Sequence, residues 1–445
     1  MTYLDKRFAL AANGTTVRTE ILAGVTTFLT MAYIVFVQPT VLGAAGMDRG
    51  AVMTATCLAT AFATALMGLL ANYPIAVAPG MGHNFFFAYS VILAMKVPWR
   101  VALGGVAIAG TIFILTAGIG LRERLITAIP ASLKHAIAAG IGLLIAMIGL
   151  QWAGLIVGAP GTLVALGNLH SRPVLVAVGS LAVTSVLLAR RVPGAFLWGI
   201  LATTVVAWRL GLAQFHGVVG GVPSLAPTFL QFDIAGAFAP GMVAVIFVFF
   251  LLALFDSVGT LVAVGEQAKL TRDGTLPRAR QALLADAIGT VAGAALGTST
   301  VTAYIESGAG VAAGGRTGLA SLVTAGLFLV SLFLHPLVQM IGGGYTLRSP
   351  SGETTLYPII AAPLILVGTM MIGGLRHVEW EDPSEAVPAF LTVIIMPLAV
   401  SITEGIAFGL MSYTLLKAGT GRAREVHPLA YVFAVLFLGR YLFLR

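Results

Sequence analysis

The 445-residue sequence has little charge and almost no cysteine, and each shortage excludes a class of protein. Only 9% of the residues are Asp, Glu, Lys or Arg, whereas soluble domains carry about 25%. A soluble globular fold is therefore excluded. The single cysteine, Cys57, has no second cysteine with which to form an internal disulfide.

The common catalytic motifs are missing as well. The sequence has no H-E-x-x-H or G-x-S-x-G motif and no cluster of Cys and His residues, so it offers neither a zinc-protease site nor a nucleophile elbow. It also has no Walker A loop, which argues against an ATP-driven pump formed by this chain alone. We expect a protein that is not an enzyme and that needs no metal or organic cofactor.

The sequence is rich in apolar residues and glycine. Hydrophobic residues make up 58% of the chain, the mean hydropathy is +0.98, and there are 53 glycines. Glycine lets helices pack closely in lipid. This composition predicts an all-α polytopic membrane protein in the lipid bilayer. The net charge of +8 resides mostly in short loops between apolar segments, so we expect no nucleic-acid partner.

Fourteen apolar segments can be traced along the chain. Several are shorter than the ~20 residues that a spanning helix needs. The short or broken ones include 74–93 and 298–314, which hold the same rank in the two sets of seven. The segments lie at about residues 20–42, 50–70, 74–93, 101–121, 131–150, 172–189, 192–211, 238–263, 281–296, 298–314, 317–340, 356–374, 385–400 and 402–417.

The distribution of Lys and Arg supports this number, because these residues concentrate in cytoplasmic loops. With the N-terminus inside, fourteen crossings place most of them on the cytoplasmic side, including Arg122, Arg124 and Arg272. The long outer connections 151–171 and 212–237 contain neither residue. We therefore expect both termini in the cytoplasm. The exceptions are Arg49, Lys96, Arg100, Arg172, Arg209 and Arg348.

A weak internal repeat relates the two halves. Seven is an odd number, so the second set of segments must be inverted relative to the first. Inverted repeats with two broken helices at the midplane are typical of secondary transporters. Matching positions at a constant offset of 228 residues are Gly80 and Gly308, Gly82 and Gly310, Pro130 and Pro358, and Gly140 and Gly368.

Polar residues in the first broken segment are candidates for a binding site. In residues 78–89, APGMGHNFFFAY, proline and glycine interrupt the helix next to His83 and Asn84. The Asn84 amide offers a donor and an acceptor, which suits the edge of a heterocycle, and the three phenylalanines that follow could stack on a flat ring. The alternative is a packing kink in which Asn84 bonds to freed backbone.

Two carboxylates lie at depth in the second half. Asp256, in LFDSVGT, is about halfway along the apolar run 246–264. Glu306 lies in the Gly-rich stretch 297–315. An ionisable group at such depth is expensive, so it usually faces a partner, a cavity or a substrate. The alternatives are a structural carboxylate at Asp256, and an ion pair between Glu306 and Arg316, which is about 15 Å further along a helix.

Together these groups favour an uncharged ligand that is rich in N–H groups. Carboxylates are acceptors, and a purine presents N–H donors along its edge. Removal from water favours the protonated form of a carboxyl group, so one acid could carry a proton during transport. An anion site would instead be expected to show Lys or Arg.

Several weaker candidates leave both readings open. Thr27, Thr30 and Tyr33 in the first segment could face the site or could satisfy their own helix backbone. Glu404 could be a gate residue or an acid in the first turn of a helix. His135, at the start of a segment, is expected at the membrane interface.

Five blocks of the sequence match the pattern of one transporter family. With them the chain resembles the nucleobase–cation symporter-2 superfamily, and within it the AzgA-like branch of adenine, guanine and hypoxanthine permeases. The blocks are 14–39, APGMGHN at 78–84, LFDSVGT at 254–260, GTSTVTAYIESGAGVAAGGRTGL at 297–319 and MPLAVSITEGIAFG at 396–409.

The resemblance implies a fold and a mode of action. It implies two inverted repeats of seven segments, with short strands in segments 3 and 10, and a core domain that moves against a gate domain. It also implies a proton-coupled importer of purine nucleobases in the cell's inner (plasma) membrane, assembled as a homodimer. The parts would be the N-terminus 1–19, core 20–121, gate 122–211, outer connection 212–237, core 238–340, gate 341–417 and a tail 418–445. The apolar stretch 427–443 in this tail could be a fifteenth span, but its 17 residues with Arg440 near the end favour an interfacial helix.

The resemblance also assigns site residues. Asp256 and Glu306 match the acidic substrate-binding positions of segments 8 and 10, and Asn84 matches the site residue of segment 3. Further substrate-binding candidates are His83, Ser307, Thr260 and Thr30.

Two departures from the family pattern bear on proton coupling. Many branch members have Leu where this chain has His83, and the uracil branch carries His where this chain has Thr260. The candidates for carrying the proton are therefore Glu306, Asp256 and His83. The competing interpretation is an anion transporter of the sulfate or bicarbonate type with the same architecture, which the acids at depth disfavour.

Overall fold

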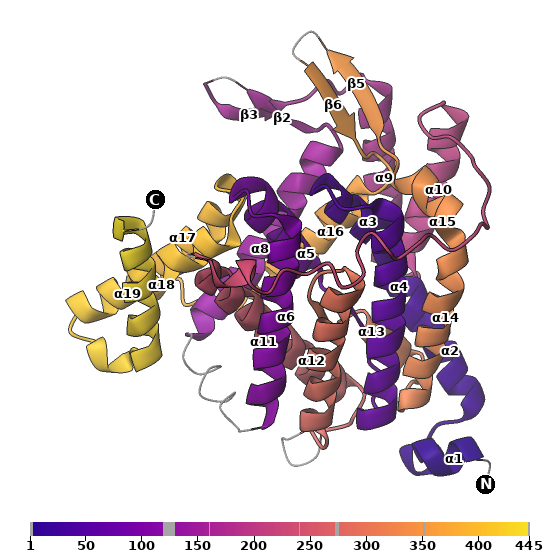
Figure 1. Ribbon diagram of the computed structural model, residues 1–445, viewed down its shortest axis with the longest axis horizontal. Helices are drawn as coiled ribbons and strands as arrows, with labels where there is room; N and C mark the ends of the chain where they lie inside the picture. Colours follow the sequence, from indigo (N-terminus) through magenta and orange to yellow (C-terminus); the bar gives the residue numbers. More distant parts are fainter. Residues whose placement is uncertain are drawn as a thin grey trace.

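A computed structural model describes residues 3–118, 130–159, 161–239, 241–271, 276–349 and 352–443. These residues form a mostly helical bundle (Figure 1). The predicted segment end at 121 and the charges at Arg122, Arg124 and Arg272 lie outside the described residues. Within the described ranges, seven helices are long and apolar enough to cross a membrane: Val17–Ala44, Arg49–Ala71, Trp99–Ala117, Ala131–Trp152, Arg172–Ala189, Met242–Gln267 and Gly318–Gly342.

The first half of the chain contains helices on either side of one short strand and one hairpin. Its elements are α1 (Tyr3–Phe8), α2 (Val17–Met31), α3 (Ile34–Ala44), α4 (Arg49–Leu66), β1 (Val77–Pro79), α5 (Met81–Phe85), α6 (Trp99–Gly118), α8 (Ala131–Trp152), β2 (Ile156–Ala159), β3 (Leu163–Leu166), α9 (Arg172–Ala189) and α10 (Ala195–Arg209). Wider, π-helical turns extend α4 and α5 over Met67–Ala71 and Phe86–Ala94.

The second half again combines helices with one short strand and one hairpin. Its elements are α11 (Met242–Gln267), α12 (Ala279–Leu296), β4 (Val301–Ala303), α13 (Ser307–Ala312), α14 (Gly318–Ser331), α15 (His335–Gly342), β5 (Tyr345–Ser349), β6 (Gly352–Leu356), α16 (Ala361–Ile372), α17 (Pro383–Leu398), α18 (Ile402–Gly419) and α19 (Pro428–Phe443). The tail segment 427–443 forms α19, and its place at the membrane interface stays a prediction.

The two predicted broken segments meet in the interior. Strand β1 pairs antiparallel with β4, with Ala78 opposite Thr302, and both strands are buried. A short helix follows each strand, α5 after β1 and α13 after β4. Gly297 makes the turn from α12 toward β4 at a φ of 100°, a left-handed conformation that glycine adopts readily. The predicted short strands in 74–93 and 298–314 are confirmed.

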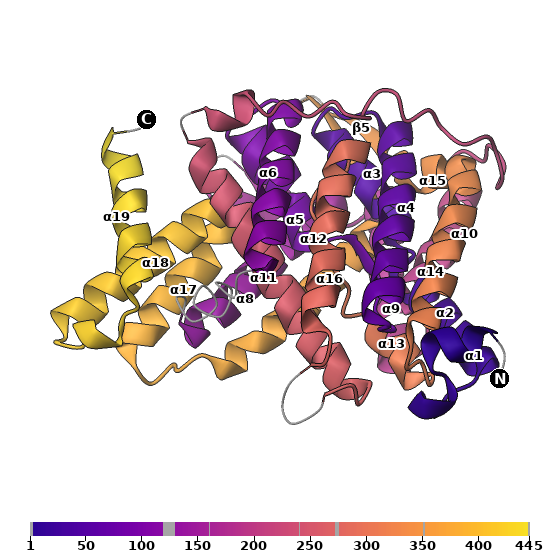
Figure 2. The same cartoon turned by 60° about the horizontal axis from the view of Figure 1, so that its bottom comes forward.

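The helices pack in two groups around this strand pair. In one group α12 packs against α4 and α6, and α14 packs against α2 and α4. In the other, α8 packs against α16 and α17, and α17 packs against α18. The hairpins β2–β3 and β5–β6 project from the same end of the molecule (Figure 1). Figure 2 shows α1 at one end of the bundle and the connection 212–237 along the opposite end.

Glu20 joins α2 to the start of α14. Its side chain is fully buried, and its carboxylate accepts hydrogen bonds from the backbone N–H groups of Arg316 at 2.8 Å, Thr317 at 3.2 Å and Ala320 at 3.2 Å. The N-terminus of a helix carries unpaired N–H groups and partial positive charge, so a carboxylate is a strong cap. This buried acid therefore has a structural partner.

A second charged cluster fastens the C-terminal helices. Lys417, at the end of α18, is buried and pairs with Glu385 of α17 at 2.9 Å and with Glu425 at 3.1 Å. Arg422 pairs with Asp382 at 2.5 Å and with Glu425 at 2.7 Å. These contacts tie the loop after α18 to the start of α17.

Candidate functional site

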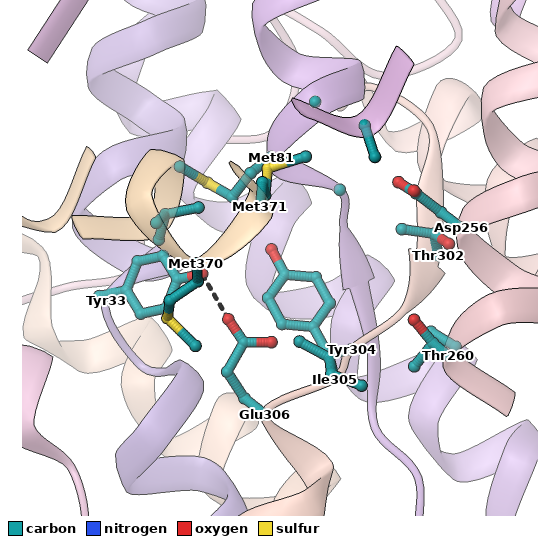
Figure 3. A pocket seen from close by; sticks show the side chains of 15 residues that line it. Tyr33, Met81, Asp256, Thr260, Thr302, Tyr304, Ile305, Glu306, Met370 and Met371 are labelled. Atoms are coloured by element: carbon teal, nitrogen blue, oxygen red, sulfur yellow. Dashed lines mark hydrogen bonds between the residues drawn. The ribbon is translucent and has the colours of Figure 1, made fainter. Parts of the chain in front are cut away.

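A cavity of about 260 Å³ lies beside the strand pair, and both helix groups contribute to its wall. Figure 3 shows two carboxylates in it, on either side of the Tyr304 ring. The lining residues are Tyr33, Gly80, Met81, Gly82, Ala138, Asp256, Thr260, Thr302, Ala303, Tyr304, Ile305, Glu306, Val367, Met370 and Met371. Three of the seven predicted substrate-binding residues, Glu306, Asp256 and Thr260, are therefore brought together here.

Glu306 occupies the turn between β4 and α13, and its partner is a tyrosine. The Tyr33 hydroxyl donates to Glu306 Oε1 at 2.7 Å, from the break between α2 and α3. The alternative ion pair with Arg316 is not formed. The Arg316 guanidinium instead donates to the carbonyl oxygens of Val311 at 2.8 Å and Gly315 at 2.7 Å. The Glu306 carboxylate is therefore left facing the cavity.

Asp256 projects from the middle of α11, on the other side of Tyr304 from Glu306 (Figure 3). Its side chain is 42% exposed, and Oδ2 lies 3.5 Å from Nδ1 of His83. Within the described part of the chain, no Lys or Arg forms a salt bridge with it. Thr260, one turn further along α11, lines the same wall. Among these residues, therefore, no Lys or Arg holds Asp256 as a structural carboxylate, and the basic side chain beside it is that of His83.

Tyr304 separates the two acids and was not anticipated as a lining residue. Its hydroxyl donates to the carbonyl oxygen of Pro79 at 2.5 Å, which fastens the turn after β4 to the end of β1. Met81, Met370 and Met371 supply flexible apolar wall. An aromatic residue two positions before Glu306 was the available signal for Tyr304. The methionines gave no signal, because they come from segments far apart in sequence.

Asn84 lies behind the strand pair and does not line this cavity. It is fully buried, its Oδ1 accepts a hydrogen bond from Ser299, and its Nδ2 lies 3.4 Å from the carbonyl oxygen of Pro79. The Ser299 hydroxyl also accepts from Gln38 at 3.2 Å. These contacts match the alternative reading, in which Asn84 satisfies backbone freed by the break.

Three other candidates also lie outside the lining. Ser307 is buried, and its hydroxyl accepts from the backbone N–H of Ala76 at 2.9 Å. The Thr30 hydroxyl donates to the carbonyl of Thr27 at 2.8 Å, within its own helix. His83 is fully buried behind Asp256. The three phenylalanines after Asn84 are fully buried as well, so none presents a stacking face to this cavity.

The charge pattern of the cavity limits what can bind there. Among the described residues, its lining contains two acids, two tyrosines and two threonines, but no Lys, Arg or His. Carboxylates accept hydrogen bonds, whereas an anion would need donors or positive charge. Among the described residues no cluster of three metal-ligating side chains occurs. The arrangement therefore suits a small ligand that donates N–H groups.

A family comparison agrees with this geometry. A family model described as the permease family matches residues 18–408. The chain belongs to this permease family. It is the family of nucleobase–cation symporters-2 that the sequence blocks indicated, so that prediction is confirmed.

Curated relatives match the permease over nearly its whole length. The adenine permease AdeP of Escherichia coli is 45% identical over 99% of this chain and 96% of its own. The guanine/hypoxanthine permease PbuG of Bacillus subtilis is 46% identical over 97% of this chain and 98% of its own.

A solved structure with the same fold is that of the transmembrane domain of a cyanobacterial bicarbonate transporter, BicA. It has a TM-score of 0.62 and 17% identity, and the match covers 87% of this chain and 97% of that one. At this identity the likeness shows the fold alone.

Proposed function

We propose that the permease imports purine nucleobases of the adenine, guanine and hypoxanthine class together with protons. The main support for the proposal is the pair of carboxylates, Asp256 and Glu306, which share one cavity. No positive side chain lines this cavity in the part of the chain that the structure describes. The similarity to the adenine permease AdeP and the guanine/hypoxanthine permease PbuG, at 45% and 46% identity, supports the same substrate class.

The two acids would bind the ring edge. In this proposal, Glu306 and Asp256 accept hydrogen bonds from purine N–H groups on opposite sides of Tyr304, and Thr260 adds a hydroxyl beside Asp256. The Tyr304 ring and the methionines cover the apolar face of the base. Either acid can carry the coupled proton, because burial around a bound base favours its neutral form.

Transport would follow from movement of one helix group against the other. Asp256 lies on α11, which packs against α6 and β4, and Glu306 precedes α13, which packs against α2, so both acids belong with the first helix group. Ala138, Val367 and Met371 line the cavity from α8 and α16 of the second group. We assign the first group to the core domain and the second to the gate domain, within fourteen segments that form two inverted repeats. The proposed setting is the plasma membrane, with both termini cytoplasmic and the chain dimeric.

Uptake of labelled hypoxanthine and guanine tests the proposal. We expect Glu306→Gln and Asp256→Asn to abolish uptake while the protein still reaches the membrane, because each removes a charged acceptor from the cavity. Glu266→Gln is the matched control, since Glu266 is exposed at the end of α11. Unchanged uptake in both cavity variants would overturn the site assignment.

The fold shared with a bicarbonate transporter supports a second candidate, an anion transporter. Its test is uptake of labelled sulfate or bicarbonate in the same vesicles. Anion uptake that purines do not inhibit would favour it over nucleobase transport. It comes second because no Lys or Arg lines the cavity within the described ranges.

A further inference from the structure

His83 lies in α5, directly behind the cavity wall, and its polar atoms are not satisfied. Its side chain is fully buried, and neither Nδ1 nor Nε2 has a hydrogen-bond partner among the described residues. Buried polar atoms without a partner cost free energy, so each is expected to have a reason. The Asp256 carboxylate lies close by, with Oδ2 at 3.5 Å from Nδ1.

The Nδ1 atom of His83 lies between Gly80 and Asp256. On one side it packs on the backbone of Gly80, where an added Cβ would stand 2.5 Å from Nδ1. On the other side lies the Asp256 carboxylate, which is itself in the cavity wall. A small rotation of either side chain closes the 3.5 Å gap to hydrogen-bond distance. Gly80 thus makes room for the imidazole, and Asp256 is the acceptor it faces.

We propose that His83 is a positioning residue of the nucleobase site and acts through Asp256. The Nδ1–H donates to Oδ2 of the carboxylate, which turns the other oxygen, Oδ1, toward the cavity to accept an N–H group of the base. The imidazole never touches the substrate, because it is not part of the cavity lining. This inference rests on the proposed function.

Substrate entry makes this hydrogen bond more important. The Asp256 side chain is 42% exposed, so water can solvate it before a base binds. A bound base displaces that water, and the carboxylate then depends on protein and ligand donors. His83 supplies the protein donor on the side away from the base. Its contribution is therefore made in the bound state and appears in substrate affinity.

Three substitutions separate this role from packing. Asparagine carries its amide nitrogen on Cγ, where histidine carries Nδ1, so His83→Asn keeps a donor toward Asp256. Glutamine places its amide nitrogen near the position of Nε2, so His83→Gln keeps a polar group but does not place a donor toward Asp256. Leucine removes both nitrogens and keeps similar bulk.

The measurement is KM and kcat for labelled hypoxanthine in vesicles, with the unfolding temperature of each purified variant. We expect His83→Leu and His83→Gln to raise KM about tenfold, as for loss of one hydrogen bond to a charged group, and His83→Asn to stay within about threefold of the unchanged protein. We also expect the unfolding temperature of His83→Leu to be unchanged or higher, because it removes two unpaired buried atoms.

An unchanged KM in His83→Leu would overturn the inference, and so would a KM in His83→Asn as high as that in His83→Gln. Lowered unfolding temperatures with a normal KM would also overturn it, because they would indicate a packing role. If His83→Leu fails to fold, the contrast between Asn and Gln still decides. Failure of the unsubstituted protein to take up any purine removes the proposed function itself. Normal uptake with insensitive variants removes only the role of His83.

Discussion

Tyr33 and Glu306 are 273 positions apart in the sequence and share a hydrogen bond of 2.7 Å. The tyrosine stands where α2 ends and α3 begins, and the glutamate stands where β4 gives way to α13. Two interruptions of regular structure thus meet at one carboxylate. Because Tyr33 is nearly fully buried, this donor holds Glu306 in place in the cavity wall.

Tyr33→Phe removes that donor and little else. We expect substrate affinity to fall about tenfold, the effect of one hydrogen bond to a charged group, with the unfolding temperature nearly unchanged. The measurement is the KM for labelled guanine in vesicles. Tyr431→Phe is the control, because its hydroxyl bonds to the Ala423 carbonyl at 3.2 Å, in the C-terminal part of the chain. Equal KM values for both variants would contradict a role for Tyr33 in holding Glu306.

Glu20→Gln weakens the cap of α14. The buried carboxylate accepts three backbone N–H bonds, and glutamine replaces one accepting oxygen with an amide that faces donors. We expect a loss of about 2 kcal/mol in unfolding free energy, with substrate KM unchanged. Thermal unfolding in detergent measures it. Glu266→Gln, on an exposed surface, should change stability by less than about 0.5 kcal/mol, and an equal loss in both variants would contradict the capping role.

Lys417→Met leaves a buried acid without its partner. Glu385 is 9% exposed and lies 2.9 Å from Lys417 Nζ, so removing the cation should destabilise the protein by about 3–5 kcal/mol. The double variant Lys417→Met with Glu385→Leu replaces both charges with apolar groups and should recover most of that loss. Thermal unfolding compares the two. A double variant no more stable than the single one would show that the pair itself is not the cause.

The folded protein should lose stability at acidic pH because the Asp382 carboxylate becomes protonated. Hydrogen bonds from the Arg422 guanidinium, and then from Ser384, hold the pKa of this exposed-loop carboxyl well below its usual range. A carboxyl whose pKa is lower in the folded state stabilises the fold above its unfolded pKa of about 4 and loses that contribution as the pH falls further. We therefore expect the unfolding temperature to decline below about pH 5.

Asp382→Asn should flatten this decline, because the amide does not titrate but still caps α17. Unfolding temperatures at several values between about pH 6 and pH 3 measure the slope. Glu381→Gln is the neighbouring control and should keep the slope of the unsubstituted protein. A slope that survives Asp382→Asn would assign the acid sensitivity to other groups.

Local signals were enough to find the two acids of the cavity. Asp256 and Glu306 stand out because a charge inside an apolar run is costly wherever the run lies in space. The broken segments were equally visible, since proline and glycine disrupt helices locally. The family resemblance implied a short strand in each break, and the structure alone showed that β1 and β4 pair antiparallel.

The contacts of Asn84 could not be predicted from the sequence. Its amide could equally face a ligand or the backbone, and the choice depends on which side of the strand pair the start of α5 presents. The hydrogen-bond partners of Glu20 could not be predicted from the sequence either. Its partners are backbone N–H groups about 300 positions away, and no side chain marks them in the sequence.

By itself, the sequence determined that the chain is a polytopic membrane protein, that two of its segments are broken, and that two acids lie at depth. Hydropathy, helix breaking and the cost of a buried charge are local properties, so they can be read without coordinates. The tertiary structure alone decided which of those polar residues share a cavity. That choice depends on register and on contacts between distant segments, which placed Tyr33 and Tyr304 beside Glu306 and set His83 behind Asp256.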